Sequence, residues 1–256
     1  MLILLPPSEG KTAARRGRPL DLGSLSFPEL TPMRDDLIEV VARASGEPEG
    51  HEVIGVNPNL VGDLERNTRL RTAPSGPASA VYSGVLYGAF DVASLDAAAK
   101  RRAARSVVVV SALFGALRLT DRIPAYRVNV CAEVEGVGLL TREWRPLLAP
   151  VLDAVVRPRE LVVDCRSSTY ASLWRPTGDR AAAWVQVAVP GASHLAKFTR
   201  GLVARELVSA EAPRTPTALA ERLGQRFGVD LAEPVRPGGP WVLSVADQSR
   251  AGAHSS

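Results

Sequence analysis

The sequence predicts a mixed α/β protein that folds as one compact domain over residues 1–246. Short apolar runs typical of buried strands alternate with longer amphipathic stretches typical of helices. The chain has 256 residues, of which 46% are hydrophobic and 23% charged, as in ordinary globular proteins within the size range of a single α/β domain. Together these observations predict a sheet covered by helices.

The expected strands are apolar runs rich in β-branched residues. Leu2–Leu5 is the first and stops at two prolines, and the continuous run Val107–Val110 is typical of a strand buried on both faces. Three further strands are expected at residues 161–164, 183–189 and 241–245. The polar residues 8–12 follow the first strand, at the edge of the sheet where α/β binding sites usually form.

The expected helices follow from capping residues and apolar periodicity. They run from Thr31 to Ala44, across residues 60–70, from Ser94 to Arg105, from Thr141 to Leu152, from Ser193 to Leu207 and from Thr215 to Phe227. Residues 81–90 contain too many glycines for an ordinary helix, so we expect a functional loop or a helix start there. Residues 111–130 hold more polar and aromatic side chains than packing requires, which indicates a functional segment. Residues 247–256 are expected to be a disordered tail.

Composition and cysteine use indicate a cytoplasmic protein. No run approaches the ~20 apolar residues that span a bilayer, and residues 1–5 are too short and lack the basic leader of a signal peptide. Cys131 and Cys165 both lie among apolar neighbours, where buried, inert thiols are expected. Two cysteines and three scattered histidines do not make a zinc site, so we predict no metal site. We also predict no cofactor and no membrane partner.

Positive charge gathers in two segments. The net charge is +4, and residues 9–18 hold Lys11 and three arginines with one acid, whereas residues 100–105 hold four cations and no acid. Each cluster is either a phosphate-binding surface or an ordinary solvated surface. Gly10 and Lys11 after a strand suggest a P-loop, but that motif requires a glycine where Leu5 stands, so we reject it.

Several motif blocks run in order along the chain. They are Pro6–Thr12, Val81–Gly84, Ser111–Arg118 with Asp121, Pro124, Tyr126 and Arg127, then Val163–Tyr170, and the basic segment Lys197–Arg205. Together they resemble the YaaA peroxide-stress family, also called UPF0246, in the actinobacterial-like form that carries Ser-Glu-Gly before the Lys-Thr pair. The resemblance runs from residue 1 to about residue 245.

The resemblance implies a family-specific mixed α/β fold with a basic cleft. It also implies a peroxide-stress protein that binds duplex or branched DNA without sequence preference and limits oxidative damage by limiting free iron. Members of the family carry a helix-hairpin-helix-like element, for which residues 113–117 are the expected position in this chain.

Most residues expected to bind nucleic acid have one of three properties. They carry a positive charge for phosphate, are glycines that let the backbone approach phosphate closely, or carry an aromatic ring that either stacks on an unpaired base or packs in the core. The set is Ser8, Lys11, Thr12, Tyr82, Ser83, Gly84, Phe114, Gly115, Arg118, Asp121, Tyr126, Arg127, Arg166, Ser167, Tyr170, Lys197, Arg200 and Arg205. Binding through these residues should weaken steeply as salt rises.

The alternative is an enzyme that acts on a nucleotide, a nucleoside or a nucleobase. Lys11 in a pocket of low dielectric would then be a base or an amine nucleophile, Asp164 a general acid or base, and Arg166 an anion clamp. An ion pair between Asp164 and Arg166 with a purely structural role is the other interpretation. A small closed pocket around Lys11 and Asp164, too narrow for a duplex, would favour the enzyme.

Overall fold

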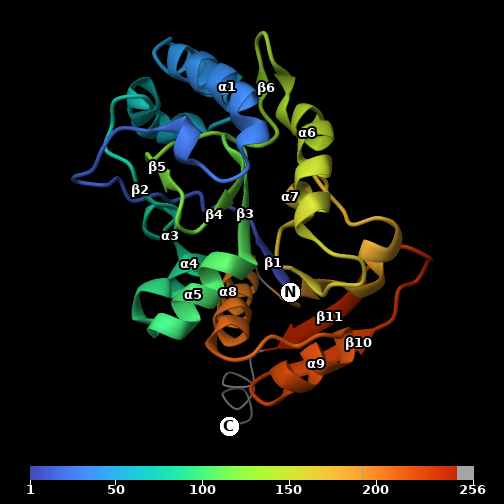
Figure 1. Ribbon diagram of the computed structural model, residues 1–256. Helices are drawn as coiled ribbons and strands as arrows, with labels where there is room; N and C mark the ends of the chain where they lie inside the picture. Colours follow the sequence, from blue (N-terminus) through green and yellow to red (C-terminus); the bar gives the residue numbers. More distant parts are fainter. Residues whose placement is uncertain (192, 247–256) are drawn as a thin grey trace.

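A mixed sheet of seven strands forms the centre of the computed structural model, which describes residues 1–191 and 193–246 (Figure 1). The strands are β1 (Leu2–Leu5), β3 (Val107–Ser111), β4 (Gly115–Arg118), β8 (Val162–Asp164), β9 (Trp184–Ala188), β10 (Gly228–Ala232) and β11 (Trp241–Ala246). Their order across the sheet is β10-β11-β9-β8-β1-β3-β4. The five inner strands are parallel, and β4 and β10 pair antiparallel at the two edges. The predicted mixed α/β fold is confirmed.

The strands β1, β3 and β8 are the most deeply buried part of the sheet. Every residue in them is buried, as expected for parallel strands whose two faces are both covered. Ile3 lies opposite Val107 on one side and opposite Val163 on the other. The apolar runs that predicted these three strands, together with those that predicted β9 and β11, are all strands in the structure.

The connections between the parallel strands reverse direction at β1. The chain passes from β1 to β3 on one side, then returns across β1 to reach β8, β9 and β11 in turn on the other side. The loops after β1 and β8 therefore diverge at the carboxyl edge of the sheet. In open α/β sheets, ligands bind in the crevice that forms at such a point.

Helices cover the sheet, and the six predicted helices all lie close to their predicted positions. The longer ones are α1 (Thr31–Ala44), the 3-10 helix η3 (Pro58–Arg69), α5 (Ala97–Ser106), α6 (Leu140–Val155), α8 (Ser193–Ser209) and α9 (Pro216–Gly224). The short ones are α2 (Gly50–Val53), α3 (Ala78–Val81), α4 (Val85–Phe90), α7 (Ser168–Ala171), η1 (Leu22–Ser24), η2 (Pro28–Leu30), η4 (Val92–Ser94) and η5 (Gly178–Ala183). Two small sheets complete the fold, β2 (Gly76–Pro77) with β5 (Arg122–Ile123) and β6 (Glu133–Val134) with β7 (Gly138–Leu139).

The capping residues differ from the prediction at two helices, because the N-caps of α1 and α6 are Leu30 and Leu139 and not Thr31 and Thr141. Asp96 caps α5, and its carboxylate accepts a hydrogen bond from the Ala99 amide. Thr215 caps α9 as predicted, through the Ala218 amide. The helix predicted at 60–70 is a 3-10 helix with a kink at Leu60, whose φ and ψ are not helical.

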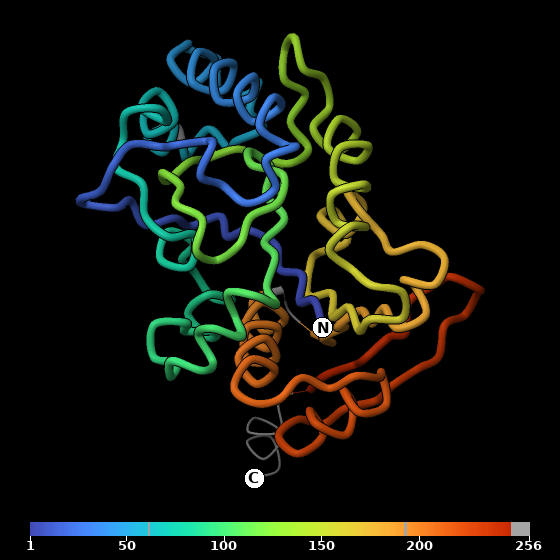
Figure 2. The backbone as a smooth tube through the Cα atoms, viewed as in Figure 1, coloured from blue at the N-terminus to red at the C-terminus, as the bar shows by residue number. Residues whose placement is uncertain are grey.

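The helices α4 and α8 are distant in sequence and packed together. Figure 2 shows the chain of α4 and α5 beside that of α8. Gly201 makes this approach possible, because a Cβ atom at this position would lie 2.2 Å from the carbonyl oxygen of Leu86 on α4. The contact fixes α4, and so positions the glycine-rich segment that precedes it.

Residues 111–118 form a strand hairpin. Ser111 at the end of β3 pairs with Gly115 at the start of β4, and Gly115 adopts a φ of +70° that favours glycine. A Cβ atom there would also lie 2.5 Å from the Trp144 ring. The expected position of a helix-hairpin-helix element at residues 113–117 is therefore wrong: this glycine turn joins two strands.

Some predictions concern residues that the structure does not describe. The expected disorder of residues 247–256 and the capping role of the Ser193 side chain both lie outside the described part of the chain. Among the helices that the structure does describe, none combines the length and the apolar character needed to cross a membrane.

Candidate functional site

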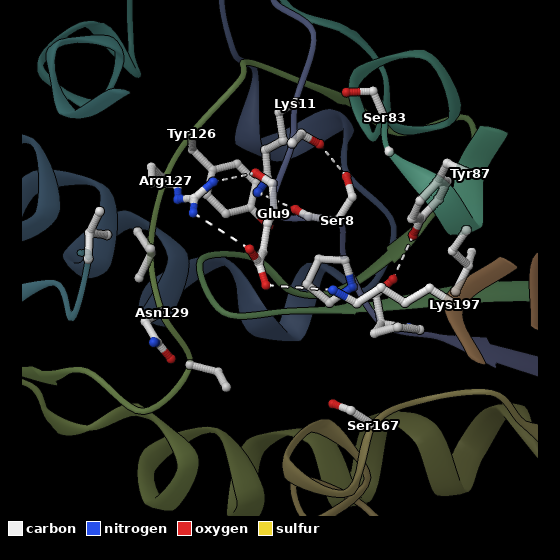
Figure 3. A pocket seen from close by; sticks show the side chains of 18 of the residues that line it. Ser8, Glu9, Lys11, Ser83, Tyr87, Tyr126, Arg127, Asn129, Ser167 and Lys197 are labelled. Carbon is white, nitrogen blue, oxygen red and sulfur yellow. Dashed lines mark hydrogen bonds and ion pairs between the residues drawn. The ribbon is translucent and has the colours of Figure 1, made fainter. Parts of the chain in front are cut away.

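A cavity of about 830 Å³ opens where the loops after β1 and β8 diverge (Figure 3). Residues from six separate segments line it. Four of the segments are 6–11, 55–60, 83–87 and 126–130, Ser167 and Tyr170 come from the fifth, and Lys197 and Arg200 of α8 from the sixth. We call this cavity the basic pocket, because Lys11, Arg127, Lys197 and Arg200 line it with Glu9 as the one acid among the described lining residues.

Lys11 is held in the basic pocket by pairing of its backbone with a segment distant in sequence. Residues 10–12 run antiparallel to residues 81–83, with the Thr12 amide donating to the Val81 carbonyl and the Ser83 amide donating to the Gly10 carbonyl. The Lys11 Nζ atom donates to the Ser8 carbonyl at 2.7 Å and lies 4.1 Å from the centre of the Tyr126 ring. Such a ring face stabilises a cation above it.

The environment of Lys11 disfavours its charged form. Burial, with a smaller contribution from the positive charges of Arg127 and Arg66, lowers the pKa of Lys11 from 10.5 to about 7. Glu9 and Asp63 oppose this shift more weakly. Within residues 1–191 and 193–246, no carboxylate lies at ion-pair distance from Nζ. A large share of Lys11 is therefore a neutral amine near pH 7.

Hydrogen-bonded tyrosines form the floor beneath Lys11. The Tyr126 hydroxyl lies 2.7 Å from Ser111 Oγ and 2.9 Å from the Tyr82 hydroxyl, and Ser111 Oγ also accepts the Phe114 amide. Burial raises the pKa of Tyr126 to about 12, so this network stays neutral at ordinary pH. The Tyr87 hydroxyl donates to the Pro6 carbonyl at 2.8 Å and fixes the loop after β1.

Glu9 lies between two cations at the mouth of the basic pocket (Figure 3). Its carboxylate is 3.8 Å from Arg127 Nη2 and 3.9 Å from Lys197 Nζ, and its side chain is 78% exposed. Arg127 also donates to the Glu9 carbonyl and lies 3.8 Å from Asp63. A loosely held carboxylate thus occupies a position that an anionic ligand group could take.

The comparison with known proteins agrees with this arrangement of motifs. The family model described as "Peroxide stress protein YaaA" matches residues 1–229. The chain belongs to the YaaA family. A UPF0246 protein of Streptomyces coelicolor is 46% identical over 255 residues, covering 96% of this chain and 98% of that protein. A UPF0246 protein of Corynebacterium efficiens is 39% identical over 250 residues, covering 96% and 99%. The predicted family and its actinobacterial branch are confirmed.

About half of the residues expected from the YaaA family motifs line the basic pocket. They are Ser8, Lys11, Ser83, Gly84, Tyr126, Arg127, Ser167, Tyr170, Lys197 and Arg200. Gly84 has a φ of +106°, which turns the chain into α4 and brings Ser83 to the cavity wall. Five motif blocks that are far apart in sequence therefore meet in one place.

Asp164 and Arg166 do not line the basic pocket, contrary to prediction. Both side chains are buried, with Arg166 Nη2 2.7 Å and Nε 2.8 Å from the two carboxylate oxygens of Asp164. Arg166 also donates to the carbonyls of Tyr170 and Trp174. This pair fixes the loop that follows β8, so the proposed acid and anion clamp are structural groups that position Ser167 and Tyr170.

Two more predicted cations lie elsewhere. Arg118 donates to the carbonyls of Arg105 and Val107 at the amino end of β3, the end opposite to the basic pocket. Arg205 donates to the carbonyls that end α4 and to Ser94 Oγ. The prediction that Arg118 shares the cleft is therefore wrong, because a side chain that far along the hairpin points to the other edge of the sheet.

The remaining predicted residues do not line the cavity. Phe114 and Tyr82 are buried in the core and cannot stack on a base, and Gly115 is the turn of the hairpin. Asp121 accepts hydrogen bonds from the Ser26 backbone and hydroxyl and from the Arg118 amide. Thr12 is exposed beside the pocket without lining it.

The two cysteines differ in environment. Cys165 is buried, as predicted, and burial raises the pKa of its thiol to about 12, so it is unreactive at ordinary pH. Cys131 is exposed, which the apolar neighbours on either side did not suggest. It follows the turn at Asn129, whose side chain accepts the Cys131 amide.

Sequence reasoning missed one whole wall of the basic pocket. Residues 55–60 contribute Gly55, Asn57 and Asn59, and the next segment contributes Asp63 and Arg66 to the charges around Lys11. The signal was present as a Gly/Asn/Pro cluster, which marks an irregular loop. Nothing in that cluster indicates that it approaches residues 6–11.

Proposed function

We propose that this protein binds nucleic acid at the basic pocket and admits one unpaired nucleotide with its neighbouring phosphates. The observation that carries the proposal is the convergence of Lys11, Arg127, Lys197 and Arg200 on a cavity of about 830 Å³. That volume lies within the range of sites for small molecules, roughly 300–1,000 Å³. It suits a single nucleotide rather than the width of a duplex.

The pocket offers complementary groups for each part of a nucleotide. Arg127, Lys197 and Arg200 present positive charge to phosphate, and Arg127 is only 15% exposed, so its charge is poorly screened by water. Tyr170 is half-buried on the cavity wall, where its ring is available to stack on a base. Since these contacts are to charge and ring faces, binding has little sequence preference.

The proposed role is protection of nucleic acid during peroxide stress, in keeping with the description of the family. The link to free iron remains a prediction from the family resemblance. In residues 1–191 and 193–246, no group of three or more His, Cys, Asp or Glu side chains could hold a metal ion.

Fluorescence anisotropy with a labelled single-stranded oligonucleotide and the matching blunt duplex tests the proposal. At low salt the single strand should bind more tightly, and Arg127→Ala should weaken it by about tenfold, because a charged hydrogen bond contributes roughly 1.5–3 kcal/mol. Arg101→Ala is the matched control, since Arg101 is exposed on α5 and does not line the pocket. Equal effects of the two substitutions would show that the protein binds by general charge alone.

A second candidate, an enzyme acting on a nucleotide-like molecule, is favoured by one observation. Lys11 lines a cavity of ligand size and is partly a neutral amine near pH 7. A lysine that only binds phosphate would keep its charge, so the lowered pKa favours a chemical role. Binding and catalysis are compatible here, because both use the same pocket.

A further inference from the structure

The Lys11 amine is placed for reaction with a ligand in the basic pocket. Lys11 lines the cavity, and the hydrogen bond from its Nζ atom to the Ser8 carbonyl uses one N–H and leaves the nitrogen lone pair available when the group is neutral. The groups around it are Glu9, Asp63, Arg66 and Arg127, together with the neutral hydroxyls of Tyr82 and Tyr126. Two nearby arginines and burial keep part of it unprotonated.

Lysine is a rare residue in this chain. The sequence has 31 lysines and arginines, and only Lys11, Lys100 and Lys197 are lysines. Two of these three line the basic pocket. Arginine serves nearly every other cationic position, but a guanidinium does not lose its proton in a protein and is not a nucleophile. A lysine at position 11 supplies a property that the chain's usual cation lacks.

We infer that Lys11 forms a Schiff base with an aldehyde, and that its ligand is the ring-opened sugar of an abasic nucleotide in DNA. The inference rests on the proposed function, because the neighbouring phosphates of the strand are what Arg127, Lys197 and Arg200 would hold. An abasic nucleotide is unpaired already, so it enters the pocket without the cost of breaking a base pair. Its open-chain form carries an aldehyde at C1′, which is the electrophile that an amine requires.

The reaction balances without a co-reactant. The Nζ lone pair attacks C1′ and the C=O electron pair moves to oxygen, which is protonated to give a carbinolamine. Loss of that oxygen as water then forms the C=N bond, so amine and aldehyde become imine and water. The protonated imine is a cation, and the Ser8 carbonyl at 2.7 Å and the Tyr126 ring face at 4.1 Å are placed to stabilise it.

Reductive trapping tests the inference. The protein is incubated with sodium cyanoborohydride and a single-stranded oligonucleotide that contains one abasic site, and the adduct is separated on a denaturing gel. An oligonucleotide with a tetrahydrofuran in place of the open sugar has no aldehyde and measures binding alone. Peptide mapping by mass spectrometry should place the adduct on Lys11, with the other two lysines unmodified.

Variants and pH sharpen the result. Lys11→Arg should lower the trapped yield by roughly a hundredfold, because guanidinium is not nucleophilic, whereas Lys100→Arg on the exposed face of α5 should trap like the original protein. The trapping rate should rise with a midpoint near pH 7, the pKa of about 7 lowered by burial, and not near the pKa of an exposed lysine.

The outcomes separate the inference from the proposed function. Binding of the tetrahydrofuran strand without any trapped adduct on the aldehyde strand overturns the inference and leaves nucleic-acid binding intact. An adduct mapped to Lys100 or Lys197 also overturns it, even when Lys11→Arg does not fold. Failure to bind the tetrahydrofuran strand counts against the proposed function itself.

Discussion

The charge of Lys11 is balanced between forces that act over a few ångströms. Removal from water and the fields of Arg127 and Arg66 favour the neutral amine, whereas the Tyr126 ring and the Ser8 carbonyl favour the ammonium. Burial is the largest of these effects and sets the direction of the shift. A ligand that excludes more water from the pocket shifts the balance further towards the amine.

The Lys11 shift should appear as a pH-dependent stability. Because the folded pKa of about 7 lies below the ordinary 10.5, the unfolded chain binds more protons between these values and stability rises with pH there. Lys11→Met removes the cost of burying this lysine. The variant should therefore exceed the original protein in unfolding free energy, and by the largest amount below pH 7. The advantage should shrink by at most about 1.4 kcal/mol per pH unit up to pH 10 in urea titrations. Lys100→Met, at an exposed site, should show no such trend.

Glu9 should compete with anionic ligands for the cations at the mouth of the pocket. Glu9→Gln removes a carboxylate held 3.8–3.9 Å from Arg127 and Lys197, and should tighten single-strand binding by about threefold, the size expected of exposed ion pairs. Anisotropy at low salt measures the change, which should fade as salt rises. Glu65→Gln removes an equally exposed acid on η3 and is the control. Weaker binding by Glu9→Gln would mean that Glu9 positions Arg127 instead of blocking it.

At the scale of elements, α8 and the hairpin β3-β4 determine where the pocket walls stand. The close approach at Gly201 presses α4 against α8, and α4 carries Tyr87 into the cavity lining. On the other side, Trp144 of α6 packs against Gly115 and donates to the Ala112 carbonyl, which fixes the end of β3 beneath Ser111. Both contacts use a glycine where a larger residue would not fit.

Gly201→Ala should disturb the pocket from a distance. The added methyl would lie 2.2 Å from the Leu86 oxygen and 2.8 Å from Ala89 Cβ, so α4 must move, at a cost of about 1–3 kcal/mol in unfolding free energy. Gly88→Ala is the matched control on α4, because nothing lies within 4 Å of its added Cβ and alanine favours a helix. Urea denaturation compares the two. Equal stability of both variants would contradict the close packing of α4 and α8.

The elements were predictable where burial is uniform and were missed where it is mixed. Val107–Val110 is apolar and β-branched throughout, which favours a buried strand, and it is one in the structure. The edge strand β10 has no fully buried residue, and its sequence therefore lacks an apolar run. The Phe114-Gly115 turn has a composition found in turns between helices and in turns between strands. Its surroundings, the strands β3 and β4 and the Trp144 ring, determine that it joins two strands.

At the scale of the whole molecule, the site is a product of strand order. The reversal at β1 brings the loops after β1 and β8 to one edge, and the motif residues on them meet α8 there. Sequence reasoning identified Lys11, Arg127 and Lys197 from their motifs. It could not show that Arg118 lies outside the pocket. Only the register of β4 against β3 places Arg118 at the amino end of β3, opposite to the basic pocket.

The field of the pocket should set the salt dependence of binding. For single strands the slope of log K against log salt is about −0.7 for each phosphate neutralised, so four lining cations, with Lys11 only partly charged, predict a slope of about −2 to −3. Arg127→Ala should make the slope shallower by about 0.7, while Arg101→Ala on α5 should leave it unchanged, since its charge lies outside the pocket. Anisotropy titrations from 25 to about 300 mM salt measure both slopes. If every arginine substitution reduced the slope alike, charge over the whole surface and not the basic pocket would be holding the strand.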